Sequence, residues 1–278
     1  MRIEFVKMHG LGNDFLVFDA PPGAADKPID AATLSALADR HTGVGFDQAL
    51  MLAPPRDARH RSLYRIFNAD GGEVEQCGNG ARCVASLMHA RRPELGRDLT
   101  LESAGGTVRA RVREDGLVAV EMGTPDFDPA SLPFDAPREM PGYFLPVDGE
   151  DVEFGCVSMG NPHAVLRVRD IATAPVGRVG PALERHPRFA KRTNVGFMEI
   201  VERAHIRLRV WERGVGETLA CGTGACAAVA VGRTGGLLDA EVRVDLPGGT
   251  ATVAWPGRGE PIWLTGPAVL VYSGSIDL

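Results

Sequence analysis

The chain has 278 residues, of which 44% are hydrophobic and 24% are charged, and these proportions are typical of soluble globular proteins. The length favours one large domain or two of ordinary size, and the composition excludes a disordered chain. The net charge is −6 and no long basic run occurs, so the sequence carries no electrostatic footprint for nucleic acid or an anionic membrane surface.

The first residues predict a strand rather than a targeting signal, because Glu4 and Lys7 interrupt the apolar run that a signal peptide requires. No stretch approaches the roughly 18 apolar residues of a membrane-spanning helix. We therefore expect a soluble, cytoplasmic protein.

The N-terminal half alternates short strands with two helices. One helix is expected over 30–40, because Asp30 can cap its first turn. A second is expected over 78–92, where Pro93 would end it. Short runs with β-branched or aromatic residues, bounded by turn formers, predict strands. These runs lie at 3–8, 15–18, 48–52, 63–67, 99–102, 108–112 and 117–122.

The next segment, 123–142, contains five prolines and little regular pattern, so we interpret it as a linker or a long crossing between two halves. Further strands are expected at 153–158, 164–168, 195–201, 206–211, 241–246, 251–255, 262–264 and 269–272. A helix should begin near Gly222. Because no charged residue occurs between Cys221 and Gly232, this helix is apolar on all sides, and we expect strands to surround it.

Three short motifs recur in the same order at similar spacing, which indicates two related halves. The motif Cys-Gly-x-Gly-Ala occurs at 77–81 and again at 221–225, an offset of 144. Segments 42–46 and 193–197 agree at four of five positions with an offset of 151, and Gly-Asn recurs at 12–13 and 160–161 with an offset of 148. Chance recurrence of glycine-rich turns is the alternative. Related halves predict a pseudo-twofold axis, with the two cysteine turns facing each other across a cleft.

The two repeated cysteines, Cys77 and Cys221, each directly precede a glycine turn that opens a predicted helix. The unpaired N–H groups and partial positive charge of a helix N-terminus favour a thiolate, lower the thiol pKa and suit a carboxylate ligand. Inversion of a carbon centre needs a base on one face and an acid on the other, and two such cysteines would supply both. No lysine motif for pyridoxal phosphate is evident, so the pair would act without a cofactor.

Other interpretations of the cysteines remain open. A disulfide between Cys77 and Cys221 is disfavoured, because five cysteines are few and odd in number and suit a reduced compartment. Zinc would require tighter spacing, and no C-x-x-C occurs. Residues 222–227 formally fit a dinucleotide-binding fingerprint, but hairpin-like strands follow where a βαβ unit is required. The other cysteines lie inside predicted elements and are expected to be buried; they are Cys83, Cys156 and Cys226.

Longer blocks along almost the whole chain resemble the signatures of the diaminopimelate epimerase family. These blocks are MHGLGNDF at 8–15, FNADG at 67–71, EVEQCGNGARC at 73–83, MGNPHAV at 159–165, ERG at 212–214 and CGTGACA at 221–227. Several long blocks in the same order are far more specific than one glycine-rich turn.

The resemblance implies a cofactor-independent enzyme that interconverts LL- and meso-diaminopimelate, a step that serves lysine and peptidoglycan synthesis. It implies an α/β (α+β) fold with two pseudo-symmetric domains, each a curved, mostly antiparallel sheet around a central helix, and an active site in the cleft between them. The domains would comprise 1–121 plus 267–278 and 122–266. Similar proteins form homodimers, and Tyr272 matches a tyrosine in their C-terminal interface strand.

The resemblance also implies residue roles. Cys77 and Cys221 would be the acid/base pair, assisted by His163 and Glu212, with no metal. Backbone groups at both helix starts would bind the carboxylate at the reacting carbon: Gly78, Asn79, Gly222 and Thr223. Its amino group would lie near Asn13 and Gln48. A second set would hold the distal carboxylate: Asn68, Asn161, Asn194 and Arg213, with Glu212 in the same pocket. Arginine suits bidentate binding of a carboxylate.

Four residues depart from the family pattern: Gly72, Trp211 and Leu219 stand where Ser, Tyr and Gln are expected, and Thr223 replaces the commoner Ser but keeps the backbone donor. Taken alone, His163 is typical of a structural histidine, and each of the asparagines is typical of a turn former. Two other functions therefore stay open. One is a related cofactor-independent racemase, similar to proline racemase-like proteins. The other is a two-lobed amino-acid-binding protein whose cysteines are inert, because fold alone does not decide function.

Overall fold

The computed structural model describes residues 2–21, 23, 29–75 and 77–277, and it separates into two compact units. Unit 1 comprises Met1–Val120 and Thr265–Leu278, and unit 2 comprises Glu121–Leu264. The sequence analysis placed the first boundary after residue 121 and the second before residue 267. The structure places them one residue and two residues earlier, respectively. Met1, Leu278 and Gln76 of the block at 73–83 lie outside the described residues.

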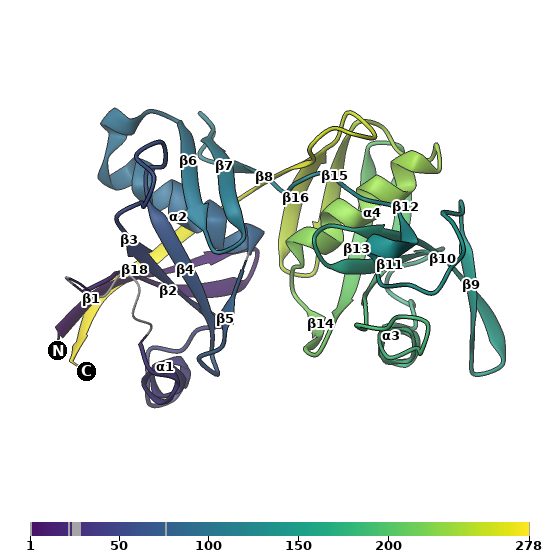
Figure 1. Cartoon of the computed structure of the whole chain (residues 1–278), viewed down its shortest axis with the longest axis horizontal. Helices are drawn as coiled ribbons and strands as arrows, with labels where there is room; N and C mark the ends of the chain where they lie inside the picture. Colours follow the sequence, from purple (N-terminus) through teal and green to yellow (C-terminus); the bar gives the residue numbers. More distant parts are fainter. Residues whose placement is uncertain (1, 22, 24–28, 76, 278) are drawn as a thin grey trace. The chain divides into compact units, whose positions relative to one another are not determined.

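The described residues of unit 1 form one mixed sheet and two α-helices, which Figure 1 shows. Its strands are β1 (Arg2–Gly10), β2 (Asn13–Asp19), β3 (Gln48–Ala53), β4 (Leu63–Asn68), β5 (Glu73–Val74), β6 (Asp98–Ser103), β7 (Gly106–Val112), β8 (Val118–Glu121) and β18 (Val269–Asp277). Its helices are α1 (Ala31–Ala38), α2 (Gly78–Arg91) and the 3-10 turn Pro93–Leu95. The strand order is β18-β1-β2-β3-β4-β6-β7-β8. Pairing is antiparallel except for β2–β3 and β4–β6.

Both helices of unit 1 begin where their capping residues predict. Asp30 accepts a hydrogen bond from the backbone N–H of Thr33 and so caps α1. The central helix α2 contacts β1, β2 and β7, and Figure 1 shows strands of the unit around it. Its residues from Ala81 to Ala85 are almost completely buried, and all of them except Arg82 are uncharged.

Unit 2 repeats this architecture (Figure 1). Its strands are β9 (Tyr143–Val147), β10 (Glu150–Ser158), β11 (Pro162–Val168), β12 (Asn194–Glu202), β13 (His205–Glu212), β14 (Gly216–Thr218), β15 (Glu241–Leu246) and β16 (Gly249–Ala254). The short strand β17 (Trp263–Gly266) includes the last two residues of unit 2 and the first two of the C-terminal part of unit 1. The helices of unit 2 are α3 (Val176–Glu184), α4 (Gly222–Thr234) and the 3-10 turn Pro129–Ser131. The pairing β9-β10-β11-β12-β13-β15-β16 is antiparallel except for β11–β12 and β13–β15. As expected, α4 is surrounded by strands, since it contacts β10–β13 and β16.

The strand registers show which positions of the two units are equivalent. Ile66 lies opposite Val74 in unit 1, and Val210 lies opposite Thr218 in unit 2. Val210 follows Ile66 by 144 residues, and Thr218 follows Val74 by 144, which is the distance along the chain between the two cysteines. Phe15 lies opposite Gln48 and His163 opposite Asn194. These registers support two related halves.

One of the three sequence matches does not join equivalent positions. The register makes Gln48 the counterpart of Asn194, whereas the match of 42–46 with 193–197 would assign that place to residue 43. Residues 42–46 lie in the turn before β3, while 194–197 lie inside β12. This part of the predicted duplication is therefore wrong, and it reflects a chance recurrence of the same small residues.

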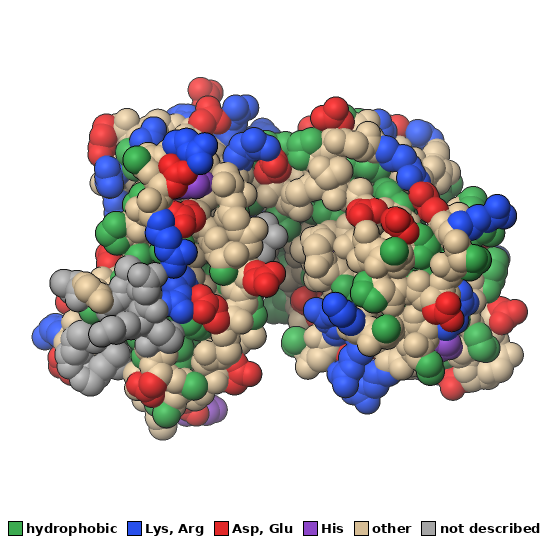
Figure 2. All heavy atoms as spheres, viewed as in Figure 1, with side chains coloured by type: hydrophobic (Ala, Val, Ile, Leu, Met, Phe, Trp, Pro, Cys, Tyr) green, Lys and Arg blue, Asp and Glu red, His purple; other side chains and the backbone are tan. Residues whose placement is uncertain are grey.

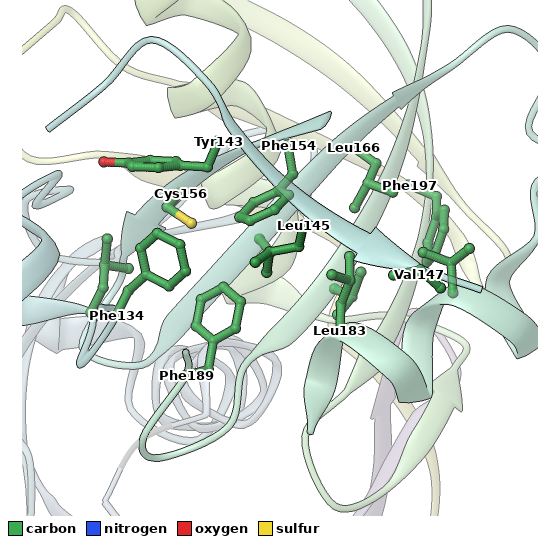
Figure 3. Packing of buried hydrophobic residues seen from close by; sticks show 14 of the residues in the cluster. Phe134, Tyr143, Leu145, Val147, Phe154, Cys156, Leu166, Leu183, Phe189 and Phe197 are labelled. Atoms are coloured by element: carbon green, nitrogen blue, oxygen red, sulfur yellow. The ribbon is translucent and has the colours of Figure 1, made fainter. Parts of the chain in front are cut away.

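The proline-rich segment 123–142 is not a linker. Leu132 and Phe134 are buried in the core of unit 2, and the Phe134 ring lies 4.9 Å from that of Tyr143 and 4.6 Å from that of Phe189, measured between centroids. Figure 3 shows Phe134 and Phe189 side by side in this cluster. The prolines restrict the backbone of the segment, and the packing of Phe134 in the core holds the segment against unit 2.

Four elements of unit 2 were not anticipated from the sequence: β9, α3, the three-residue strand β14 and the 3-10 turn Pro129–Ser131. Helix α3 contains Gly177, Gly180 and Pro181, which lower helix propensity, yet its apolar residues Val176, Val179 and Leu183 face the core. Strand β9 carries Pro146, although its alternate residues are buried. Tertiary burial overrides the local signals in α3 and β9.

None of the helices among the described residues combines the length and apolarity that crossing a membrane requires. Figure 2 shows acidic and basic side chains interspersed over the face that it presents.

Candidate active site

In unit 1, Cys77 occupies the N-cap position of α2. Its Sγ accepts a hydrogen bond from the backbone N–H of Gly80 at 3.4 Å, and the residue is half-buried. A Cβ at Gly80 would lie 3.1 Å from the Leu50 side chain, so the glycine lets the turn pack closely against β3. The sulfur therefore lies at the positive end of the helix dipole.

The Asn13 side chain links this turn to the start of β2. Its Nδ2 donates to Asp47 Oδ2 at 3.1 Å, which leaves its Oδ1 directed toward the helix start. That oxygen accepts from Asn79 Nδ2 at 3.3 Å and from the Cys77 thiol at 3.8 Å. Thus Asn13, Cys77 and Asn79 form one hydrogen-bonded group.

Gln48 and Asn68 form a second polar pair in unit 1. They lie opposite each other on β3 and β4, and Gln48 Nε2 donates to Asn68 Oδ1 at 2.9 Å. Gln48 Oε1 is buried and has no hydrogen-bond partner within the described part of the chain. A buried acceptor without a partner is suited to a ligand donor.

In unit 2, Cys221 caps α4 in the same way. Its Sγ accepts from the backbone N–H of Gly224 at 3.3 Å and lies 3.6 Å from Thr223 Oγ1. Glu212 is close enough to act on the thiol electrostatically and to accept its hydrogen bond. The Thr218 hydroxyl donates to Glu212 Oε1 and so helps to hold that carboxylate.

The pKa of the Cys221 thiol is raised well above its ordinary value, contrary to our expectation. Burial of the sulfur is the largest cause, and the negative charge of Glu212 adds to it. The hydrogen bonds from Thr223 and Gly224 act in the opposite direction but do not outweigh these effects. The prediction of a lowered thiol pKa from the helix N-terminus alone is therefore wrong for Cys221.

Replacing Glu212 by glutamine should lower the pKa of Cys221, because a neutral amide does not oppose the thiolate. Alkylation of Cys221 by iodoacetamide at a fixed, mildly alkaline pH should then be faster than in the parent protein, as measured by peptide mass spectrometry. Glu217→Gln is the matched control, because Glu217 pairs with Arg209 on the neighbouring strand. Equal Cys221 alkylation rates in parent and Glu212→Gln would contradict the electrostatic explanation.

His163 lies on β11, completely buried, and its Nε2 is 3.0 Å from Asn161 Oδ1. Burial is the main cause that lowers the His163 pKa to about 3, and the charge of Arg213 adds to it. The imidazole is thus neutral near pH 7. Since Asn161 Oδ1 can only accept, Nε2 carries the proton, and the buried Nδ1, which has no partner among the described residues, is a hydrogen-bond acceptor. Asn161 Nδ2 also donates to Thr223 Oγ1 at 3.4 Å.

Asn194 connects the start of β12 to the turn that carries Arg213. Its Nδ2 donates to the backbone oxygen of Pro162 at 3.0 Å, and its Oδ1 accepts from the backbone N–H of Arg213 at 2.9 Å. The Arg213 guanidinium is exposed and donates to the Lys191 carbonyl oxygen at 3.1 Å.

The sequence-predicted residues are thus divided between the two units. Unit 1 holds Cys77, Gly78, Asn79, Asn13, Gln48 and Asn68, and also Tyr272 on β18. Unit 2 holds Cys221, Gly222, Thr223, Asn161, His163, Asn194, Glu212 and Arg213. By register, His163 corresponds to Phe15, and Glu212 corresponds to Asn68. In both pairs the residue of unit 2 can ionise, whereas its counterpart in unit 1 cannot.

Sequence reasoning missed two residues that hold predicted site residues in place. Asp47 orients the Asn13 amide, and Arg82 donates from Nη2 to Asn79 Oδ1 at 2.7 Å. Arg82 is completely buried in an otherwise apolar stretch of α2. A lone arginine in such a stretch was the available signal.

All five cysteines belong to the described residues, and none of them forms a disulfide there. Cys83, Cys156 and Cys226 are buried, as predicted. Burial raises the pKa of Cys83 to about 12 and that of Cys156 further above its ordinary value. These thiols are therefore protonated near neutral pH.

Comparison with known proteins identifies the family. The family model for diaminopimelate epimerase matches residues 5–127 and 155–271. A diaminopimelate epimerase from Thioalkalivibrio sulfidiphilus is 55% identical over 280 residues, and one from Stutzerimonas stutzeri is 51% identical over 278; both alignments cover 100% of each chain.

Solved structures show the same fold. A predicted epimerase from Pseudomonas aeruginosa superposes with a TM-score of 0.70 at 19% identity, covering 99% of each chain. A hydroxyproline epimerase from Agrobacterium vitis gives a TM-score of 0.68 at 16% identity, covering 99% of this chain and 92% of that one. This likeness confirms the predicted α/β fold class. Together with the family match and the two full-length relatives, it establishes that the chain belongs to the diaminopimelate epimerase family.

Proposed function

We propose that this protein interconverts LL- and meso-2,6-diaminopimelate by proton transfer at the α-carbon, without a cofactor. The observation that carries the proposal is the repeated Cys-capped helix start, with Cys77 on α2 and Cys221 on α4. The full-length relatives named diaminopimelate epimerase support the choice of substrate. In the cytoplasm, the product would serve lysine and peptidoglycan synthesis.

The proton transfer requires one cysteine as thiolate and the other as thiol. The thiolate takes the proton from the α-carbon, and the electron pair of the broken C–H bond spreads into the adjacent carboxylate. The thiol then gives its proton to the opposite face of the carbon, which inverts the centre and leaves the cysteines with exchanged roles. Glu212 beside Cys221, and the neutral His163, would assist these transfers.

The substrate carboxylate at the reacting carbon would receive hydrogen bonds from the backbone at Gly78, Asn79, Gly222 and Thr223. Helix N-termini stabilise negative charge that develops during reaction. Gln48 Oε1 is a buried acceptor without a partner among the described residues, which suits an ammonium group, and Asn13 Oδ1 would add a second acceptor beside Cys77. The distal carboxylate would be bound by Asn68, Asn161, Asn194 and Arg213, in a pocket shared with Glu212.

Incubation of the reduced protein with LL-diaminopimelate in D2O should give meso product that carries deuterium at the inverted carbon, since the incoming proton comes from solvent-exchanged thiol. Chiral chromatography with mass spectrometry measures both products. A folded, reduced protein that gives neither meso product nor deuterium incorporation would refute the proposal. Binding detected by calorimetry without exchange would instead indicate an amino-acid-binding protein, and turnover confined to proline analogues would indicate a related racemase.

We further propose that the protein forms a homodimer through β18. Four consecutive hydrophobic residues on this strand, Val269 to Tyr272, are each exposed by 41–53%, and such exposed apolar runs mark protein interfaces. Tyr272 stands edge-on to Phe5 with 6.0 Å between ring centroids.

The dimer proposal predicts that Tyr272→Asp shifts the protein toward monomer in sedimentation velocity experiments, because it would bury a charge in the interface. Val215→Asp is the matched control, since Val215 is the most exposed of the large hydrophobic residues and lies in unit 2. A parent protein that sediments as a monomer at all concentrations would rule the dimer out.

A further inference from the structure

Helix α3 ends in a buried carboxylate that the mechanism does not use. Glu184 is 1% exposed. Its Oε2 accepts a hydrogen bond from Trp211 Nε1 at 2.9 Å, and its Oε1 accepts from the backbone N–H of Gly214 at 2.9 Å. Arg192 and Arg185 approach these oxygens to 3.6 and 3.9 Å.

The two hydrogen bonds enclose the residues that the proposed function places at the substrate. Glu212 and Arg213 lie between Trp211 and Gly214, and we name residues 211–214 the Arg213 turn. Asn194 holds the middle of this turn through the backbone N–H of Arg213. Glu184 therefore fixes both ends of the Arg213 turn, whereas Asn194 fixes its centre.

The surface of α3 is shaped to receive the Trp211 ring. A Cβ at Gly180 would lie 2.8 Å from Trp211 Cβ and Cγ, which is closer than real contacts allow. Residues four apart share one face of a helix, so Gly180 and Glu184 act on the same indole. Glycine supplies the space, and glutamate supplies the acceptor.

Charge keeps Glu184 in its acceptor form. Burial alone would raise its pKa, but the hydrogen bonds from Trp211 and Gly214 and the charges of Arg185 and Arg192 outweigh burial and lower the pKa below its ordinary value. Both oxygens are therefore available as acceptors near neutral pH. A glutamine at this place would direct an NH2 group at one of the two donors.

We propose that Glu184 is a positioning residue that holds Glu212 and Arg213 in place for the substrate, acting through Trp211 and the backbone N–H of Gly214. Its effect on catalysis rests on the proposed function of the chain.

The test compares Glu184→Gln and Trp211→Phe with the parent protein. For each variant we expect kcat/KM for LL-diaminopimelate to fall about tenfold, mainly through KM, because a loosened Arg213 turn misplaces the group that binds the distal carboxylate. In the double variant the loss should be smaller than the product of the two single losses, since both changes break the same hydrogen bond.

A second measurement separates positioning from general destabilisation. If Glu212 moves away from Cys221, the pKa of that thiol falls, and alkylation of Cys221 at fixed pH becomes faster. Cys77 is the control within the same molecule, because it lies in unit 1 and its alkylation rate should not change. A merely structural defect would not alter one thiol in this selective way.

Two variants of unit 2 serve as matched controls. Glu199→Gln changes a carboxylate that accepts from the Ile171 N–H and from Arg207, and Trp255→Phe removes an indole N–H that donates to the Glu260 carbonyl oxygen. Both should leave KM and Cys221 alkylation near the parent values. If the controls change these quantities as much as Glu184→Gln and Trp211→Phe do, the proposal is wrong.

A third pair of variants tests the ring contact without removing a hydrogen-bonding group. Gly180→Ala should displace Trp211 and raise KM, whereas Gly177→Ala, on the same helix with no atom within 4 Å of its added Cβ, should leave KM unchanged. If Glu184→Gln does not fold, the two glycine variants and Trp211→Phe still test whether the position of Trp211 controls KM. Parent-like KM and Cys221 alkylation in all folded variants would overturn the inference. A parent protein without epimerase activity would refute the proposed function instead, and Cys221 alkylation would still test the positioning.

Discussion

Cys77→Ala and Cys221→Ala should each lower the epimerisation rate of LL-diaminopimelate by at least about a thousandfold, because inversion needs a proton acceptor and a proton donor and each variant lacks one of them. The rate is measured by chiral chromatography of the product under reducing conditions. The fold should persist, because alanine is tolerated at a helix N-terminus at a cost of about 1 kcal/mol.

Cys156→Ala is the control for this pair. Cys156 is buried in the hydrophobic cluster of unit 2, so its loss should affect stability and not the rate per folded molecule. If either Cys77→Ala or Cys221→Ala retained near-parent turnover, a single base would suffice, and the two-cysteine mechanism would have to be abandoned.

Phe134→Ala should lower the free energy of unfolding of unit 2 by about 3–5 kcal/mol, the range for truncation of a buried aromatic residue. The ring lies within 4.6–6.0 Å of the rings of Tyr143, Phe154 and Phe189, measured between centroids, and its loss would leave a cavity in the cluster of Figure 3. Chemical denaturation followed by circular dichroism measures the change.

Phe144→Ala provides the comparison for Phe134→Ala. Phe144 lies on β9 beside Tyr143 but is 57% exposed, so its truncation should change the free energy of unfolding by no more than about 0.5 kcal/mol. A similarly small effect of Phe134→Ala would show that segment 123–142 is only loosely attached.

The sequence predicted the elements whose local signals agree with their burial. Asp30 marks the start of α1, and the glycine turns mark the starts of α2 and α4. Helix α3 escaped prediction because its glycines serve tertiary contacts, as Gly180 does with Trp211. The segment 123–142 was misread for the same reason, since proline content says nothing about where Phe134 packs.

The candidate site was predictable as a set of residues, but its electrostatics were not. A helix N-terminus is visible in sequence, whereas the burial of Cys221 and its closeness to Glu212 arise only when β13 lies beside α4. The supporting residues Asp47 and Glu184 were hidden for a related reason, because each acts through a contact between elements that lie far apart in the chain. Arg82 differs, since it lies three residues after Asn79 on α2 and its charge in an apolar stretch was a visible signal.

The strand β18 ties the end of the chain to its beginning, because Arg2 lies opposite Asp277 in its pairing with β1. During synthesis, unit 2 is complete at Leu264, whereas unit 1 still lacks the strand that covers β1. Domains generally fold as units while the ribosome works. The sheet of unit 1 can therefore be completed only after unit 2 has been made, and until β18 is available β1 presents an open edge to any chaperone or neighbouring chain.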